Sequence, residues 1–200
     1  MPDRMMKKDI ILAGVGGQGI ISIAAIIGYA ALEQGLYLKQ SEVHGMAQRG
    51  GDVQSNLRIS DREIASDLIP CGKADLIISV EPLESLRYLP YLSPGGWLIT
   101  STKPYVNIPE YPDMEKVLAE IAKLPRHIML DADGIAKDTG SVKTANIVIL
   151  GAATPFVGME YSQIEEAIRF IFRSKGDEVI QMNLNALMAG RKMAEEQMKN

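Results

Sequence analysis

The chain has 200 residues, 46% hydrophobic and 23% charged, which excludes a largely disordered protein and is enough for one large domain or two small ones. A formal net charge of −4, with no run of lysine and arginine, gives no reason to expect nucleic acid or an anionic membrane as a partner. Because Cys71 is the only cysteine and His44 and His127 lack the spacing of a zinc site, we expect no disulfide, metal or iron–sulfur cluster held by this chain alone.

The first predicted element is a buried strand over residues 9–13, because a short apolar run ends there at glycine. Residues 14–19 read Gly-Val-Gly-Gly-Gln-Gly, and a helix is predicted over residues 20–34 with Gly35 just beyond its end. Residues 10–32 superficially resemble a signal peptide or membrane span, but the glycines interrupt them. We therefore expect neither, and a cytoplasmic protein. Gly17 is expected at a crowded strand-to-helix turn.

The middle of the chain alternates between strand and helix patterns. Further strands are predicted over residues 36–41, 53–59, 74–80, 97–100 and 127–130. Helices are predicted over residues 81–92 and 114–124, with a Pro-Gly-Gly turn at residues 94–96. This alternation predicts an α/β fold with a Rossmann-like, doubly wound and mostly parallel sheet.

The last quarter of the chain has a helical pattern. A helix is predicted over residues 146–153, followed by a turn at Pro155. Ser162 and Glu165 have the spacing of a capping box that opens an amphipathic helix, and a final helix is predicted over residues 177–197. Since no repeat or linker interrupts the chain, we expect one domain over residues 1–200 with a helical extension over about 144–200. Three methionines of the last helix fit either packing or an interface. They are Met182, Met188 and Met193.

The glycine string satisfies the dinucleotide fingerprint G-x-G-x-x-G in its required place between a strand and a helix. The same glycines would also let the strand and helix pack closely with no ligand bound. Only Glu42 is available as a late candidate for the ribose-binding carboxylate, and no dehydrogenase catalytic group follows. An NAD(P)-dependent oxidoreductase and a nucleotide-binding regulatory module therefore stay open as alternatives.

Residues 14–19, together with residues 44–51 (His-Gly-Met-Ala-Gln-Arg-Gly-Gly), resemble the gamma-type domain of pyruvate and related 2-oxoacid:ferredoxin oxidoreductases. Residues 74–84, the Gly95-Gly96 turn and residues 146–151 are similar to the same family, so the likeness covers about residues 9–188. Within the family, residues 44–51 resemble the smaller, beta-named subunit of the indolepyruvate oxidoreductases. This branch implies aryl 2-oxoacids as substrates, such as indolepyruvate or phenylpyruvate.

The resemblance implies a division of labour between two chains. A larger subunit would hold thiamine diphosphate, Mg²⁺ and [4Fe-4S] clusters, decarboxylate the 2-oxoacid, pass electrons to ferredoxin and release an acyl-CoA. This chain would supply no catalytic and no metal-binding residue, would be inactive alone, and would support the larger subunit. Contact between this chain and CoA, and a homodimer of the isolated chain, are left open.

Nine residues are candidates for a cofactor or interface contact. They are Gly14, Gly16, Gly17, Gln18, Gly19, Arg49, Gly50, Gly51 and Asn146. The Arg49 guanidinium could bind a phosphate or carboxylate, or instead fix its own loop or a partner surface. Asn146 lies in an apolar stretch and is expected to hydrogen-bond to backbone in the interior or at a subunit face.

Overall fold

The computed structural model describes residues 6–45, 50–106 and 108–199. Within these residues, six strands form one sheet in the order β2-β3-β1-β4-β5-β6. The strands are β1 (Lys7–Val15), β2 (Tyr37–His44), β3 (Asp52–Ser60), β4 (Ala74–Ser79), β5 (Leu92–Ser101) and β6 (His127–Leu130). The helices are α1 (Ile20–Glu33), α2 (Pro82–Arg87), α3 (Met114–Ala122), α4 (Ala132–Asp138), α5 (Ala145–Val157), α6 (Tyr161–Phe172) and α7 (Asp177–Gln197).

The sheet is mixed. β1, β4, β5 and β6 are parallel to one another, whereas β3 lies between β1 and β2 and is antiparallel to both. The prediction of an α/β fold with C-terminal helices is confirmed, but the sheet is less uniformly parallel than predicted. The physical reason is the short connection from His44 to Asp52, which has no room for the crossover helix that a parallel pair requires.

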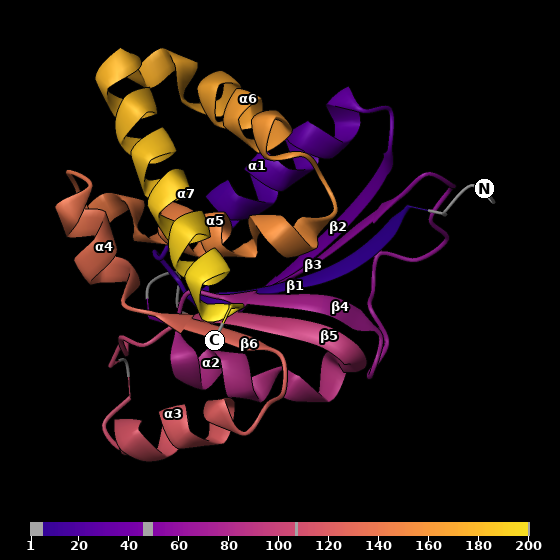
Figure 1. Cartoon of the computed structure of the whole chain (residues 1–200). Helices are drawn as coiled ribbons and strands as arrows, with labels where there is room; N and C mark the ends of the chain where they lie inside the picture. The colour runs from indigo at the N-terminus through magenta and orange to yellow at the C-terminus, as the bar shows by residue number, and fades with distance from the viewer. Residues whose placement is uncertain (1–5, 46–49, 107, 200) are drawn as a thin grey trace.

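Helices cover both faces of the sheet (Figure 1). α2 and α3 lie on one face, and α1, α5, α6 and α7 on the other. β1 is buried on both sides, since Ile10 and Leu12 belong to the larger hydrophobic cluster while Ile11 and Ala13 belong to the smaller one. This confirms the predicted fully buried strand.

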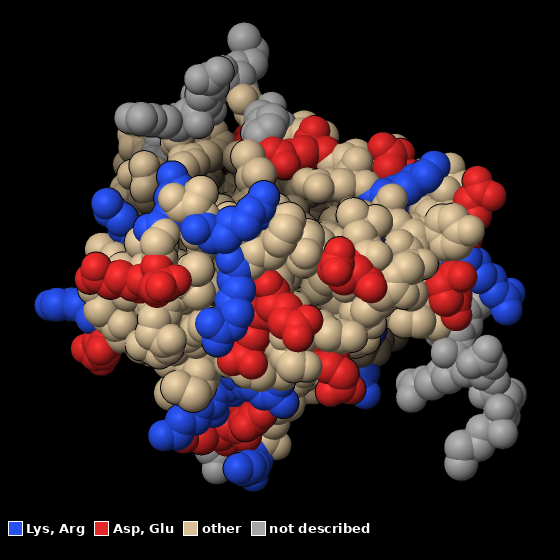
Figure 2. All heavy atoms as spheres, turned by 90° about the horizontal axis from the view of Figure 1, so that it is seen from above, with Lys and Arg blue, Asp and Glu red and all other residues tan. Residues whose placement is uncertain are grey.

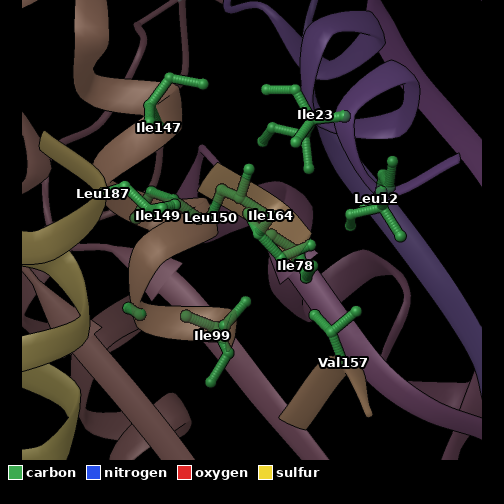
Figure 3. Close-up of a cluster of buried hydrophobic side chains, with 14 of the residues drawn as sticks. Leu12, Ile23, Ile78, Ile99, Ile147, Ile149, Leu150, Val157, Ile164 and Leu187 are labelled. Carbon is green, nitrogen blue, oxygen red and sulfur yellow. The ribbon is translucent and has the colours of Figure 1, made fainter. Parts of the chain in front are cut away.

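The C-terminal helices pack onto the face of the sheet that the larger hydrophobic cluster covers (Figure 3). Leu12 and Ile78 of the strands and Ile149 and Leu150 of α5, labelled in the close-up, belong to one cluster of buried hydrophobic side chains. α5 and α7 approach each other through glycines, because a Cβ at Gly151 would overlap backbone atoms of Leu187. A Cβ at Gly190 would likewise overlap the carbonyl group of Val148. The helical extension is therefore part of the core. No helix among the described residues combines the length and apolarity needed to span a bilayer.

Two predictions about the helical segments were wrong, and one helix was missed. Pro155 lies inside α5 and does not form a turn. Proline removes the hydrogen bond that the carbonyl four residues earlier would accept, and here the Thr154 hydroxyl donates to that carbonyl, Gly151 O, at 2.7 Å. The capping box is formed by Glu160 and Gln163, so the predicted Ser162–Glu165 pair lies two residues too far along. α4, directly after β6, was not predicted.

The segment from Glu81 to Ser101 also differs from its prediction. α2 ends at Arg87, and a 3₁₀ turn over Leu89–Tyr91 replaces the rest of the expected helix. Pro90 lies in that turn and cannot donate a backbone hydrogen bond. The expected turn at residues 94–96 lies inside β5, where the register against β4 shifts between Ala74 and Leu76.

Candidate functional site

The glycine loop, residues 16–19, connects β1 to α1 at the carboxyl ends of the parallel strands, the edge where open α/β sheets bind ligands. Its partner is the pair Gly50 and Gly51, directly before β3. The Gly16 N–H donates to Gly51 O at 2.8 Å, and the Gly50 N–H donates to Gly16 O at 3.4 Å. The fold thus brings together two segments that the sequence marked separately.

Gln18 fixes the position of the glycine loop. Its side-chain Oε1 accepts from the Val15 N–H at 2.8 Å, and its Nε2 donates to Val80 O at 3.4 Å. The side chain therefore links the ends of β1 and β4. Gln18 stabilises the loop, with its amide oxygen and nitrogen both engaged by the backbone.

Asn146 and Gly19 are in direct contact although 127 residues separate them. The Asn146 Nδ2 donates to Gly19 O at 3.1 Å. Gly19 has a φ of 81°, and a Cβ there would lie 2.5 Å from Asn146 Nδ2. Glycine is required at this position by both backbone conformation and space. Asn146 hydrogen-bonds to backbone, as expected, at the first residue before α1.

Gly17 differs from its prediction. Its φ is 101°, but a Cβ at this position would meet no atom within 4 Å. The expected crowding is therefore absent, and backbone conformation alone favours glycine. Gly17 faces the cavities beside the loop.

Two adjoining cavities of about 240 and 460 Å³ share Gly17, Gln18, Lys143 and Asn146 in their walls. The smaller cavity, called the crevice below, lies at the strand ends, between Val80 after β4 and Lys103 after β5. The larger cavity extends from Ser22 of α1 to Met182 of α7. The loop and Asn146 form the boundary between them.

The charges around the site are mixed. Lys103 Nζ lies 3.5 Å from Asp131, whereas Lys143 is exposed and makes no ion pair with any described residue. Acidic and basic side chains are interspersed on the face seen from above in Figure 2, without a large area of one sign. Any positive charge left unpaired in the walls of these cavities therefore comes, among the described residues, from the single side chain of Lys143 and not from a basic surface.

A buried carboxylate, Glu81, lies directly beyond β4 and is 1% exposed. Its Oε2 caps α2 by accepting from the Glu84 N–H at 2.8 Å. Its Oε1 accepts from the Tyr105 N–H at 3.3 Å and from the Tyr111 hydroxyl. Burial raises the pKa of Tyr111, and the hydrogen bond to Glu81 raises that pKa further, so the phenol remains a donor near neutral pH. Glu81 joins α2 to the connection between β5 and α3.

Glu84 is a second buried acid, 4% exposed, whose two oxygens accept from Arg87 at 2.8 and 3.3 Å. Burial raises the pKa of Glu84 and outweighs the opposing effect of Arg87. The hydrogen bond to Glu84 raises the pKa of Arg87, which shows that the ion pair attracts even though burial dominates the pKa of Glu84. Burial and the charge of Asp52 raise the pKa of neighbouring Tyr88 to about 12.

The family model for pyruvate ferredoxin/flavodoxin oxidoreductases matches residues 9–193. The chain belongs to this family. It is 37% identical to indolepyruvate oxidoreductase subunit IorB of Archaeoglobus fulgidus, covering 94% of this chain and 96% of the relative. It is 36% identical to the subunit of the same name from Pyrococcus horikoshii, covering 96% and 98% of the two chains. The resemblance inferred from residues 14–19 and 44–51 is thereby confirmed.

The fold of this family member also matches a solved structure, 2-oxoglutarate:ferredoxin oxidoreductase from Magnetococcus marinus with 2-oxoglutarate, coenzyme A and succinyl-CoA bound. The TM-score is 0.75 at 22% sequence identity, and the match covers 95% of this chain. It covers 31% of the Magnetococcus chain, so the same fold occurs there within a longer polypeptide.

Most candidate residues of this family member lie close together, around the glycine loop. Arg49 lies outside the described residues, so its role stays a prediction. Glu42 lies on β2, and β3 separates that strand from β1. A ribose-binding carboxylate is expected on the strand beside β1, so this order disfavours the dinucleotide alternative. Among the described residues, no group of three or more His, Cys, Asp or Glu side chains could hold a metal ion.

Sequence reasoning missed the role of Glu81. Residues 81–84 contributed to the family resemblance, yet no contact was assigned to them. The available signal was an acidic residue directly after a buried strand and directly before Pro82, the position of a helix N-cap. Nothing local in the sequence points to its partners in the β5–α3 connection.

Proposed function

We propose that this chain is the small subunit of an oxidoreductase that oxidises aryl 2-oxoacids such as indolepyruvate to acyl-CoA, with ferredoxin as the electron acceptor. The near end-to-end likeness to two indolepyruvate oxidoreductase subunits, at 36–37% identity, carries this proposal. The whole chain, residues 1–200, is taken as one gamma-type domain that includes the helical extension. Its place of action is the cytoplasm.

In this proposal, a larger subunit holds thiamine diphosphate with Mg²⁺ and the [4Fe-4S] clusters, which supply the chemistry of decarboxylation and electron transfer. The donor set of this chain fits that division, because Cys71 is its single cysteine and a cluster requires several thiolates. The described residues therefore act by shape and contact. The glycine loop, held by Gln18 and by Gly51, gives the larger subunit a firm surface beside its cofactor.

A contact with CoA at the same edge is the second part of the proposal. No described side chain caps the first turn of α1. The Ser22 N–H donates to Gly19 O, which leaves the N–H groups of Ile20 and Ile21 available at the glycine loop. Such a helix end favours an anion, and Lys143 adds a positive charge in the wall of both cavities. A phosphate of CoA is an anion that this reaction brings to the complex, and Arg49 is a further candidate to bind it.

Reconstitution tests the proposed function. The isolated chain, assayed anaerobically with indolepyruvate, CoA and ferredoxin, should reduce no ferredoxin. Addition of the larger subunit should restore indolepyruvate-dependent reduction that neither chain supports alone. Turnover by this chain alone would contradict the proposal. Binding of a nicotinamide nucleotide at micromolar concentration would favour the dehydrogenase alternative instead.

A further inference from the structure

β2 is an edge strand of the sheet, and the part of the chain that the structure describes places no further strand against its outer edge. The strand is eight residues long, from Tyr37 to His44, so it offers a long row of backbone hydrogen-bonding groups there. At the other edge of the sheet, the end of α7 packs against β6. Because an open edge pairs readily with a strand of another chain, β2 is the edge at which this sheet can be extended.

α1 adds an apolar stripe beside the same edge (Figure 1). Ile21 and Leu32 are 60% and 58% exposed, and their separation of eleven residues is about three helical turns, which puts both on one side of the helix. Gly28 belongs to that side, and a Cβ there would lie 3.1 Å from the Leu38 side chain of β2. The stripe therefore lies on the β2 side of α1. Only Ala25 and Gly28 stand between its two exposed ends, so no bulky side chain blocks the approach of a second helix.

β2 itself has an exposed apolar pair on its other face. Side chains alternate between the two faces along a strand, and Leu38 contacts α1, so the odd-numbered residues of β2 point to the opposite face. On that face Tyr37 and Val43 are 51% and 57% exposed. Each of them lies three residues from Gln40, which is the midpoint between them.

This spacing is self-complementary about a two-fold axis. An axis perpendicular to the sheet at Gln40 would pair β2 with β2 of a second copy in antiparallel register, and Tyr37 of each copy would lie opposite Val43 of the other. Aromatic and β-branched side chains interact favourably across antiparallel strands. The same axis would set the two α1 helices antiparallel on one face of the sheet, with Ile21 of one copy toward Leu32 of the other.

The charges of β2 are compatible with this register. Lys39 would stand opposite Ser41, and Glu42 opposite Leu38, so no two like charges are directly opposed. A lysine that projects from an edge strand discourages pairing, but the Lys39 Nζ donates to Ala65 O at 3.2 Å and is held by the β3–β4 connection. A strand of an unrelated chain would have no reason to match this spacing, which favours a second copy as the partner.

We propose that β2 and the apolar stripe of α1 form a homodimer interface, in which the sheets of two copies join through antiparallel β2 strands into one continuous sheet. None of the interface residues named above lines the crevice, so the dimer is separate from the proposed CoA contact. The dimer requires only this chain and goes beyond the proposed function.

Two substitutions test the interface, one on each element. Leu32→Glu places a charge in the stripe of α1, and Val43→Glu places one on β2. Met188→Glu is the matched control, because Met188 is 61% exposed on α7, the helix that reaches the opposite edge of the sheet. Sedimentation of each isolated chain over a range of concentrations measures the dissociation constant of the dimer. Circular dichroism checks that each variant retains the fold.

The wild-type chain should form a dimer at micromolar concentration. Leu32→Glu and Val43→Glu should each raise the dissociation constant at least about tenfold, because every dimer would bury two unpaired carboxylates. Met188→Glu should stay within about twofold of wild type, since its side chain lies outside the interface.

Gln40→Cys tests the register of the strands. Cys71 is the only cysteine, so Cys71→Ser removes every other thiol. In that background Gln40→Cys should give a disulfide-linked dimer on mild oxidation, because opposite residues of antiparallel strands have Cα atoms about 4.5–5.5 Å apart, a distance that a disulfide spans. Gln181→Cys in the same background, on the exposed side of α7, should give none.

A wild-type chain that stays monomeric at high micromolar concentration would overturn the proposal, and so would a dimer that Leu32→Glu and Val43→Glu leave intact. Failure of Gln40→Cys to cross-link an existing dimer would overturn the pairing of the β2 strands. A wild-type monomer whose activation of the larger subunit is weakened by Val43→Glu would assign the surface to that subunit and also overturn the proposal. The dimer assays use the isolated chain, so absence of the dimer would leave the proposed function standing.

Discussion

The side-chain amide of Gln197, in the last turn of α7, pairs with both backbone polar groups of Met129 in the edge strand β6. Gln197 Nε2 donates to Met129 O at 2.7 Å, and its Oε1 accepts from the Met129 N–H at 3.3 Å. The amide thus occupies hydrogen-bonding positions that a further strand would use. An open edge invites pairing with another chain, so the end of α7 protects the sheet from edge-to-edge association.

Gln197→Ala should therefore lower the free energy of unfolding by about 1–2 kcal/mol, since two hydrogen bonds are lost in a partly buried place. It should also increase self-association at high concentration. Gln181→Ala is the matched control, because the Gln181 amide bonds only to Asn185 on the exposed side of the same helix. Urea unfolding and sedimentation measure the two effects. Equal behaviour of the two variants would show that the Gln197 pairing does not protect the edge.

Tyr111→Phe should loosen the connection between β5 and α3. The phenol donates to a buried carboxylate, and such charge-assisted hydrogen bonds contribute about 1.5–3 kcal/mol. We expect the free energy of unfolding to fall by about that amount and amide exchange at Tyr105 to become faster. Tyr37→Phe, on a 51% exposed tyrosine of β2, should change neither. Slow exchange at Tyr105 in Tyr111→Phe would mean that the Tyr105–Glu81 bond alone holds the connection.

The raised pKa of Glu84 predicts how stability depends on pH. The folded protein binds the proton more tightly than the unfolded chain, whose carboxyl titrates near the ordinary value of 4.5. In the window between that value and the higher folded pKa, the folded state holds more protons. The contribution of Glu84 to the free energy of unfolding is therefore complete below 4.5 and declines as pH rises through the window. The difference between wild type and Glu84→Gln, measured by urea unfolding across this range, should decline accordingly. A difference that grows with pH would mean that Arg87 outweighs burial.

The parts of the fold predicted well are those whose signal is local. The apolar runs of β1 and β4 identify buried strands, and the ends of α7 coincide with the predicted helix at residues 177–197. The helix through Pro155 was missed because its compensation, the Thr154 hydroxyl on Gly151 O, appears only after folding. The insertion of β3 between β1 and β2 also has no periodic signature, since strand order is a property of the assembled sheet.

The candidate site divides in the same way. The glycine loop is visible from spacing alone, whereas its attachment to Gly51, a residue marked separately in the sequence, was not predicted. The role of Glu81 was not visible, because Tyr105 and Tyr111 lie 24 and 30 residues away from it. The crowding expected at Gly17 was wrong, and the crowded glycine is Gly19, because Asn146 packs against it from another helix.

Gly19→Ala and Gly17→Ala should therefore differ. Both place an L side chain at positive φ, which costs about 1–3 kcal/mol, but only the Gly19 Cβ would meet Asn146. Gly19→Ala should lower the free energy of unfolding by more, since Asn146 must move from its bond to Gly19 O. Chemical denaturation of the two variants makes the comparison. A larger loss for Gly17→Ala would contradict the contact between α5 and the glycine loop.

Lys143→Gln tests the proposed CoA contact. Lys143 is exposed and lines both cavities, so its removal should leave the melting temperature unchanged. If it faces a phosphate of CoA, the KM for CoA should rise about three- to tenfold, because a solvent-exposed charged contact contributes about 1 kcal/mol. The KM for the 2-oxoacid should not change. Lys73→Gln is the control for loss of one charge. Lys73 is an exposed lysine directly before β4, at the end of the strands opposite to the glycine loop. High salt should reduce the difference between Lys143→Gln and wild type, since screening weakens an exposed ionic contact. An unchanged KM for CoA would remove Lys143 from the site and leave the α1 N-terminus and Arg49 as the candidates for that phosphate.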